Sequence, residues 1–290
     1  MATCPRNPSS SRRLLKFRAD TLPCLATLPD EWIAPPQWRA IDFISDLHLA
    51  ENTPATQAAL AHYLSHTRAD AIFLMGDIFE VWIGDDARHQ AYEAGLLAML
   101  SQAAARTPHR TLFFMAGNRD FLLGAAMAAD AGLIRLADPC VLQAFGHRHL
   151  LSHGDAWCLE DRDYQAFRAQ VRAPEWQQAF LDKPLAERRA IARSLRERSM
   201  AQKAAQAERP ELWADLDTDS VRAALQARGC TTLIHGHTHR PAHHELGGGL
   251  VREVLSDWDL DHGAPRAEVL RLSPQGLQRL PLQAALVDAC

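Results

Sequence analysis

Short apolar runs alternate with polar clusters along the middle of the chain. The runs have the composition of β-strands and read "IDFIS" at 41–45, "AIFLM" at 71–75, "TLFFMA" at 111–116, "HRHLLS" at 147–152 and "TTLIH" at 231–235. Alanine-rich segments with helical spacing lie between several of them. Strands that alternate with helices predict a layered α/β fold built from βαβ units.

Each apolar run ends in a polar cluster. The clusters are "DLH" at 46–48, "GD" at 76–77, "GNRD" at 117–120, "HGD" at 153–155 and "GHTH" at 236–239. Open α/β sheets form their sites beyond the carboxyl ends of the strands. We therefore expect the clusters to share one functional site.

Four segments do not follow this rhythm. Residues 160–228 are almost wholly helical in pattern, with arginine-rich turns such as "ERRAIARSLRER", and predict a helical lobe inserted over the site. The segments "GLVREVLSDWDL" and "AEVLRLSPQGLQRLPL" after residue 239 predict strands that complete a second sheet. Residues 1–38 are rich in Ser, Pro and Arg and predict a disordered extension before a domain of residues 39–290. A targeting peptide is the alternative, which the acidic residues of this segment disfavour.

Composition restricts the class of protein. The net charge of −4 over 290 residues gives no sign of a general nucleic-acid binder. The six cysteines are scattered and form no CxxC pair, which fits a reducing compartment. No apolar run reaches the ~18–20 residues that cross a bilayer, so any membrane contact is expected to be peripheral.

The polar clusters supply imidazole, carboxylate and amide donors at Asp46, His48, Asp77, Asn118, His153, His237 and His239. This mixture of nitrogen and oxygen suits Mn, Fe(II) or Zn better than a metal that prefers thiolates. Seven donors are too many for one ion with an open position, and they suit two ions ~3.5–4 Å apart that share a carboxylate. One such cluster alone would be a turn or a helix cap. The ordered set predicts a dinuclear hydrolytic centre.

The order D-x-H, G-D, G-N-R-D, H-G-D, G-H-x-H resembles that of the calcineurin-like metallophosphoesterases over residues 41–258. The resemblance implies a four-layered αββα metallophosphoesterase sandwich with an inserted helical cap. It gives one metal to Asp46, His48, Asp77 and His239. It gives the other to Asp77, Asn118, His153 and His237, with Asp77 bridging. Asp120 and Asp155 would orient histidines from outside the ligand set.

Longer motifs are more specific than the superfamily. They are "GDIFEVWIGDD" at 76–86, "GNRDFLLG" at 117–124, "HGDAWCLEDRDYQAFR" at 153–168 and "IHGHTHRPAHHEL" at 234–246. They resemble the branch that hydrolyses the pyrophosphate of UDP-2,3-diacylglucosamine in lipid A biosynthesis. That resemblance implies UMP and 2,3-diacylglucosamine 1-phosphate (lipid X) as products, two Mn²⁺ per chain, and a peripheral place on the cytoplasmic face of the inner membrane. We expect a monomer that binds no nucleic acid.

The same resemblance assigns roles around the metals. The catalytic residues would be Asp77, Asn118, Arg119 and His237. Arg119 offers a planar fork to a phosphate oxygen, and Asn118 and His237 would also lie near the phosphate. The further substrate contacts would be Asp161, Ser199, Lys203 and Gln206. Here the sequence departs from the pattern, which has an amide at 203 and a lysine at 206.

Several readings stay open. Glu80, Asp85 and Asp86 can serve as loop caps and hydrogen-bond partners, or can contact metal. The arginines Arg188, Arg189, Arg193, Arg196 and Arg198 form either a solvated helix face or a contact with anionic lipid headgroups. A nuclease or phosphomonoesterase would need a basic groove beside the metals. A metal-free binding module would have replaced a ligand, and none is replaced.

Overall fold

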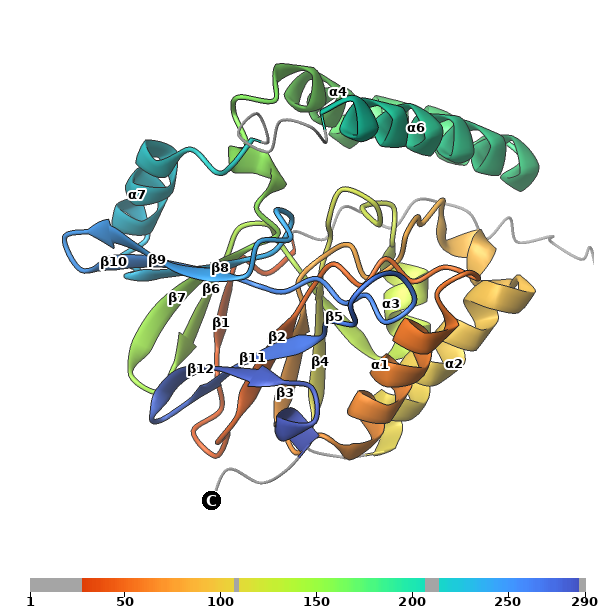
Figure 1. Ribbon diagram of the computed structural model, residues 1–290. Helices are drawn as coiled ribbons and strands as arrows, with labels where there is room; N and C mark the ends of the chain where they lie inside the picture. The colour runs from red at the N-terminus through yellow and green to blue at the C-terminus, as the bar shows by residue number, and fades with distance from the viewer. Residues whose placement is uncertain (1–27, 107–109, 207–213, 287–290) are drawn as a thin grey trace, which may run out of the picture.

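Two six-stranded β-sheets face each other in the computed structural model, which describes residues 28–106, 110–206 and 214–286 (Figure 1). Within 198–206 only the backbone is described. The first sheet has the order β12-β11-β2-β3-β4-β5 and the second has the order β1-β6-β7-β8-β10-β9. Each sheet mixes parallel and antiparallel pairs.

The first sheet carries the first three apolar runs of the sequence. Its strands are β2 (Ile41–Ile44), β3 (Ala71–Leu74), β4 (Thr111–Met115), β5 (Leu133–Leu136), β11 (Glu268–Ser273) and β12 (Gly276–Pro281). Strands β2 to β5 are parallel, so their carboxyl ends lie along one edge. Three of the predicted polar clusters begin at that edge.

The second sheet carries the other two runs. Its strands are β1 (Glu31–Ile33), β6 (Cys140–Ala144), β7 (His147–Ser152), β8 (Thr232–His235), β9 (Ala242–Gly247) and β10 (Leu250–Val254). Strands β7 and β8 are parallel neighbours, and the remaining two polar clusters follow them. Short 3₁₀ turns add η1 (Asp85–His89), η2 (Asp155–Trp157) and η4 (Ala284–Leu286).

Three apolar clusters separate four layers. The inter-sheet cluster includes Phe73 and Phe113, whose rings stack 4.3 Å apart. Helices α1 (Pro54–His66), α2 (Ala91–Arg106) and α3 (Ala125–Ala131) cover the outer face of the first sheet. Helix α7 (Thr218–Ala227) covers the second through Val221 and Leu225. The four-layered αββα sandwich predicted from the sequence is confirmed.

A buried ion pair explains a difference from the sequence prediction. Arg271 on β11 donates from Nε to Oδ1 of Asp42 on β2 at 2.7 Å, and the Tyr63 hydroxyl of α1 donates to the same carboxylate at 2.6 Å. Strand β11 therefore joins the first sheet beside β2. The prediction that both C-terminal segments complete a second sheet was wrong, because only the hairpin of β9 and β10 enters that sheet.

The helical lobe lies above the carboxyl edges of both sheets (Figure 1). It contains α4 (Arg162–Arg172), α5 (Pro174–Leu181) and α6 (Leu185–Gln206). Helix α7 packs on the second sheet instead, so the predicted insertion of residues 160–228 divides between the lobe and the outer layer. We call the part formed by α4, α5 and α6 the cap.

The prediction of disorder over residues 1–38 was wrong for residues 28–38. Strand β1 pairs in parallel with β6, Trp32 packs edge-on against Phe113 at 4.8 Å, and Trp38 is buried. The two tryptophans stabilise this segment, because large aromatic side chains bury apolar area that a sequence rich in Ser, Pro and Arg lacks. Residues 1–27 lie outside the described residues.

Candidate metal centre

The predicted polar clusters meet where the carboxyl edges of the two sheets approach each other. Backbone hydrogen bonds continue the strand pairing into these loops. Asp46 N donates to Gly76 O at 3.0 Å, and His48 N donates to Asp77 O at 3.0 Å. On the other sheet Gly236 N donates to His153 O, also at 3.0 Å. These hydrogen bonds fix the loops relative to one another beyond the ends of the strands.

Backbone strain gathers at this site. Among the described residues, six that are not glycine have positive φ. Five of them are predicted ligands: Asp46, His48, Asp77, His237 and His239. Such conformations cost about 1–3 kcal/mol each and persist where the surroundings enforce them, commonly at functional sites. The turns aim the five side chains inward at a cost in stability.

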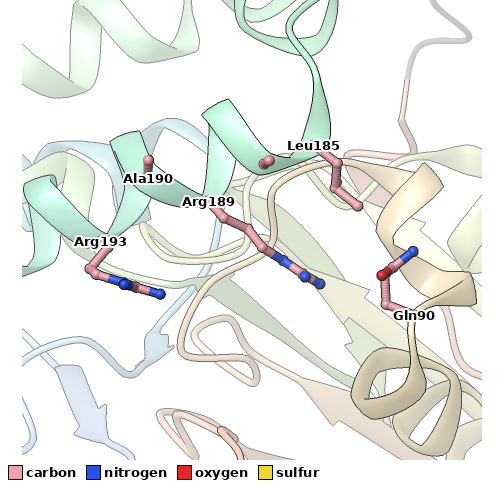
Figure 2. Close-up of a pocket in the computed structure, with 6 residues that line it drawn as sticks. Gln90, Leu185, Arg189, Ala190 and Arg193 are labelled. Atoms are coloured by element: carbon pink, nitrogen blue, oxygen red, sulfur yellow. The ribbon is translucent and has the colours of Figure 1, made fainter.

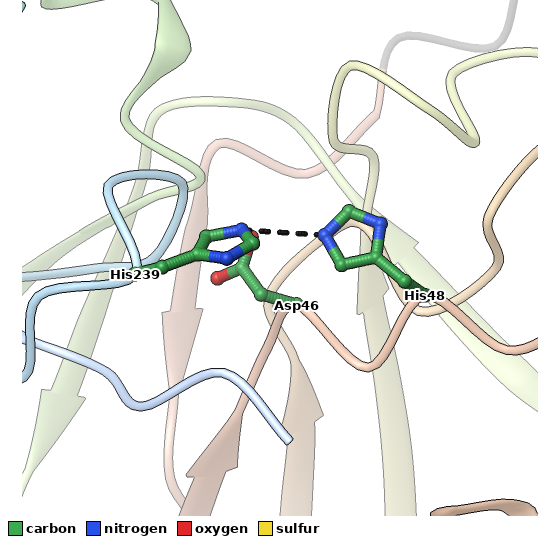
Figure 3. Close-up of side chains that lie close together, drawn as sticks. All are labelled: Asp46, His48 and His239. Atoms are coloured by element: carbon green, nitrogen blue, oxygen red, sulfur yellow. Dashed lines mark hydrogen bonds and ion pairs between the residues drawn. The ribbon is translucent and has the colours of Figure 1, made fainter. Parts of the chain in front are cut away.

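Asp46, His48 and His239 form the first donor group (Figure 3). His48 Nε2 lies 3.3 Å from His239 Nε2, and Asp46 Oδ1 lies 3.3 Å from His239 Nε2. Asp46 Oδ2 accepts hydrogen bonds from the Ser45 hydroxyl at 2.6 Å and from His237 N at 2.9 Å. Oδ1 is buried and accepts no aligned hydrogen bond, which leaves a lone pair available to a cation.

Asp77 lies between this group and a second one. Its Oδ2 is 3.9 Å from His48 Nε2 and its Oδ1 is 3.6 Å from His153 Nε2, so the two oxygens face different histidines. Asn118 Oδ1 is 3.1 Å from His153 Nε2 and 3.0 Å from His237 Nδ1. The closest three-residue groups are Asp46 with His48 and His239, and Asp46 with Asp77 and His153. Asp46 as well as Asp77 thus adjoins both groups.

The charge field of the site suits cations. Burial alone would raise the pKa of Asp46, but the nearby charges of His239, His153 and His48 hold it well below its usual range. Burial alone would lower the pKa of His153, yet Asp77 and Asp46 raise it to about 9. Asp46 and Asp257 likewise raise the pKa of His239 to about 10 against its burial. Protons held this way are ones that a divalent cation would replace.

The seven donors fit a divalent-metal site. They combine imidazole nitrogens with carboxylate and amide oxygens, their atoms lie 3–4 Å apart, and one buried carboxylate oxygen lacks a hydrogen-bond donor. The structure therefore brings all seven predicted ligands into one continuous cluster.

Comparison with known proteins agrees with this geometry. The calcineurin-like phosphoesterase family profile matches residues 40–241. A UDP-2,3-diacylglucosamine hydrolase of Chromobacterium violaceum is 49% identical over 245 residues, which cover 84% of this chain and 99% of the relative. One of Xanthomonas oryzae pv. oryzae is 43% identical over 244 residues, covering 81% and 96%.

This chain belongs to the UDP-2,3-diacylglucosamine hydrolase family. It is accordingly a metal-dependent hydrolase of the calcineurin-like class. A solved archaeal phosphodiesterase covers 83% of this chain and 99% of its own, at 9% identity and a TM-score of 0.42.

In this hydrolase, groups outside the predicted set orient the histidines. Glu80 Oε2 lies 3.2 Å from His48 Nδ1, and Asp257 Oδ2 lies 3.4 Å from His239 Nδ1. The Glu80–His48 contact is a close approach whose angle is not that of an aligned hydrogen bond. Carboxylates on the far nitrogen of a ligating histidine are a common arrangement around metals. In the sequence, the run of acidic residues after the "GD" motif was the only indication that Glu80 lies at the site, and no pattern indicated Asp257.

The predicted roles of Asp120 and Asp155 were wrong. Asp120 accepts hydrogen bonds from Gly117 N and Ile78 N, both at 2.8 Å, and so shapes the loops. Burial and the charge of Asp77 raise its pKa to about 6. Asp155 accepts from the Tyr164 hydroxyl at 2.5 Å. In the part of the chain that the structure describes, neither carboxylate is hydrogen-bonded to a histidine.

Asp155 instead accepts hydrogen bonds from side chains of α4, the first cap helix, and so joins that helix to the site. Besides Tyr164, Arg168 donates from Nε to its Oδ2 at 2.8 Å. Arg172 of the same helix donates to Gly117 O at 2.9 Å. The Tyr164 ring lies 5.9 Å from the His237 ring. These residues were not singled out from the sequence, because their contacts join a helix to loops that are distant along the chain.

The structure describes the side chains of some predicted substrate contacts and not of others. Arg119 donates its backbone N–H to Asp77 Oδ1 at 2.8 Å, and its buried Nε has no hydrogen-bond partner among the described residues. Asp161 is the N-cap of α4 and accepts from Tyr164 N at 3.0 Å. Ser199, Lys203 and Gln206 lie on the last turns of α6, and their side chains are outside the described residues.

The other carboxylates of the loop after Asp77 form hydrogen bonds and ion pairs with neighbouring elements. Asp85 accepts from Gly124 N at 2.7 Å and from Met127 N at 2.9 Å, at the start of α3. Asp86 pairs with the buried guanidinium of Arg188 on α6. The loop therefore joins the metal site, the outer helices and the cap.

Proposed function

We propose that this hydrolase cleaves the pyrophosphate of UDP-2,3-diacylglucosamine to give UMP and 2,3-diacylglucosamine 1-phosphate, using two Mn²⁺. The relatives that carry this activity in their names align with nearly their whole length. The observation that carries the proposal is the gathering of all seven predicted donors from the strand ends of both sheets, most of them in left-handed turns.

The seven donors divide into the two proposed ligand sets that the resemblance implies. Asp46, His48, Asp77 and His239 would hold one ion, and Asp77, Asn118, His153 and His237 would hold the other. Asp77 is suited to bridge because its two oxygens face His48 and His153. When bound, the two cations would neutralise charge on the phosphoryl oxygens and activate a water for attack. The mixed nitrogen and oxygen donors suit Mn, Fe(II) or Zn, and Mn is the ion proposed because the family resemblance implies it.

The chain's own residues would position the substrate. Arg119 would offer its unpaired Nε–H to a phosphate oxygen, where a planar fork gives directional, charge-assisted hydrogen bonds. Asn118 and His237 adjoin each other at 3.0 Å and would lie beside the same phosphate. Asp161, Ser199, Lys203 and Gln206 are proposed to contact the sugar from the cap.

A peripheral place on the cytoplasmic face of the inner membrane is part of the proposal. No helix among the described residues is long and apolar enough to cross a bilayer. Arg189 and Arg193 line a pocket of about 500 Å³ between α6 and Gln90 (Figure 2). Arg188, Arg189 and Arg196 pair with Asp86, Glu93 and Glu80 of the domain below. Arg193, which makes no such ion pair among the described residues, is therefore the arginine at the pocket that is proposed to meet anionic headgroups.

The deciding experiment supplies Mn²⁺ and UDP-2,3-diacylglucosamine to the metal-stripped protein and follows products by mass spectrometry. We expect UMP and lipid X only when metal is added, and a loss of at least ~10²-fold in Asp77→Asn. Brisk cleavage of an aryl phosphate ester with no turnover of the lipid would leave the metal centre standing and refute the substrate.

Binding to anionic vesicles tests the membrane contact. We expect binding that weakens between low and high salt and that decreases in Arg193→Ala, because each basic residue near an anionic surface contributes about 1 kcal/mol. Binding that does not change with salt would contradict an electrostatic contact.

A further inference from the structure

Glu80 lies within the loop that carries Asp77, between β3 and η1, and is mostly buried, with its side chain 12% exposed. Three cationic or potentially cationic side chains surround its carboxylate. Oε2 is 3.2 Å from His48 Nδ1, Oε1 is 2.8 Å from Arg196 Nε, and Oε1 is 3.9 Å from Arg119. One carboxylate thus meets a predicted metal ligand, a predicted phosphate contact and the cap.

The main chain fixes Glu80 beside the loop of His48. Glu80 N donates to Leu49 O at 3.1 Å, and Leu49 N donates to Ile78 O at 3.0 Å. The two loops are therefore paired on either side of Phe79, directly before the Glu80 side chain. This main-chain pairing brings Glu80 and His48 together, so their contact does not depend on a flexible segment.

The two nitrogens of His48 have different surroundings. Nε2 faces His239 and Asp77, whereas Nδ1 faces Glu80. A carboxylate that accepts the far N–H of a ligating histidine fixes the ring orientation and raises the basicity of the nitrogen that faces a metal, and Glu80 Oε2 lies within reach of that N–H at 3.2 Å. Loss of such a partner typically weakens metal binding 10–100-fold.

Helix α6 touches the domain below through other ion pairs as well. Arg188 pairs with Asp86, and Arg189 Nη2 lies 2.9 Å from Glu93 Oε1. Neither acidic partner contacts a predicted ligand. Among the described ion pairs and hydrogen bonds, Glu80 is the residue that joins an α6 side chain to a predicted metal ligand.

We propose that Glu80 is a positioning residue that couples helix α6 of the cap to His48. It links the position of the cap to the state of the metal centre. This inference rests on the proposed metal centre. Because coupling between two sites is reciprocal, metal binding should restrain α6, and release of α6 should change the response of the protein to metal.

Hydrogen exchange with and without Mn²⁺ tests the coupling in peptides that cover residues 185–197. We expect Mn²⁺ to slow exchange there in the wild type and in Glu93→Gln. Glu93→Gln is the matched control, since it removes the same charge from another partner of α6 without touching His48. In Glu80→Gln, which keeps the side-chain shape, the Mn-dependent slowing should disappear and Mn²⁺ affinity measured by calorimetry should fall 10–100-fold.

Arg196→Ala tests the contact of Glu80 with α6 separately from its contact with His48. It should lose the Mn-dependent slowing while lowering Mn²⁺ affinity by much less than Glu80→Gln does, because the partner of His48 remains and only the coupling to α6 is lost. Equal slowing in the wild type and in Glu80→Gln would overturn the coupling and leave the proposed function intact. Failure of the wild type to bind Mn²⁺ would instead refute the metal centre, and the coupling with it.

Discussion

At the scale of single residues, glycines allow the ligand loops to touch. A Cβ on Gly117 would lie 2.1 Å from Asp77 Oδ1, and one on Gly236 would lie 2.4 Å from Asp46 Oδ2. One on Gly76 would meet His153 Nδ1 at 2.6 Å. Each of these glycines precedes a predicted ligand and packs against a ligand of another cluster. The "GD", "GN" and "GH" pairs therefore reflect packing between loops.

Gly117→Ala should damage the site. The new methyl group would displace the Asp77 carboxylate, and misplacement by about 1 Å can cost ~10²-fold in rate. Turnover of the nucleotide-sugar substrate measures the loss. Gly95→Ala is the control: its Cβ has open space within α2, so activity should stay unchanged and the free energy of unfolding should rise by about 0.5–1 kcal/mol. Similar activity in both variants would contradict the packing argument.

His149 makes stability depend on pH. It is buried on β7, both ring nitrogens lack hydrogen-bond partners, and burial followed by the charge of His147 lowers its pKa to about 4 from the ordinary 6.5. The folded state favours the neutral ring. The contribution of His149 to the free energy of unfolding is therefore fully present above pH 6.5 and is lost as the pH falls toward 4. The loss at pH 5 should be about 2 kcal/mol.

His149→Leu should remove that dependence. Urea unfolding at pH 7 and pH 5 should show the variant gaining stability relative to the wild type by about 2 kcal/mol between the two values. A stability difference that is the same at both pH values would show that His149 does not titrate in this range.

At the scale of elements, the beginning of α6 is anchored by one arginine. Arg188 is 3% exposed and donates to Ile83 O at 2.6 Å, to Lys183 O at 3.0 Å and to Asp86 Oδ1 at 2.9 Å. Asp86 is exposed, so solvent screens the ion pair and the carbonyl contacts dominate. The anchor places α6 over the loop that begins at Asp77.

Arg188→Ala should loosen the cap without unfolding the domain. It leaves the buried Ile83 carbonyl without its donor, which costs about 1–3 kcal/mol. We expect faster hydrogen exchange along α6 and a higher KM. Arg193→Ala, on the same helix, lines the pocket beside Gln90 and should change α6 exchange little. Equal effects of the two substitutions would show that α6 is not anchored at Arg188.

At the scale of the whole molecule, the site belongs to neither sheet alone. Asp46, Asp77 and Asn118 follow strands of the first sheet, and His153 and His237 follow strands of the second. Ions bound between them would stabilise the folded sandwich, because the unfolded chain cannot assemble the same donors.

Metal removal should therefore lower the melting temperature. Mn²⁺ at 100 times its dissociation constant stabilises a folded protein by about 2.7 kcal/mol, which corresponds to several degrees at this size. Scanning calorimetry with Mn²⁺ and with a chelator measures the shift, and Asp77→Asn should show less of it. Identical melting of the wild type in both conditions would refute a resident metal.

Local pattern was sufficient to predict much of this arrangement. The apolar runs at 41–45, 71–75 and 111–116 become β2, β3 and β4, since a buried parallel strand needs apolar residues on both faces. The residues after each run reach the same edge for the same reason. The third cap helix, α6, likewise follows from its length and helical spacing, because arginine and alanine favour helices.

Tertiary structure decided what depends on partners far apart along the chain. The sequence by itself determined the strands, the donor residues and the order of their clusters, because strand pattern and loop chemistry are local. Only the fold placed β11 beside β2, set Glu80 against His48 and Asp257 against His239, and turned Asp155 toward Arg168. These contacts join surfaces from different layers, and no local periodicity encodes which surfaces will meet.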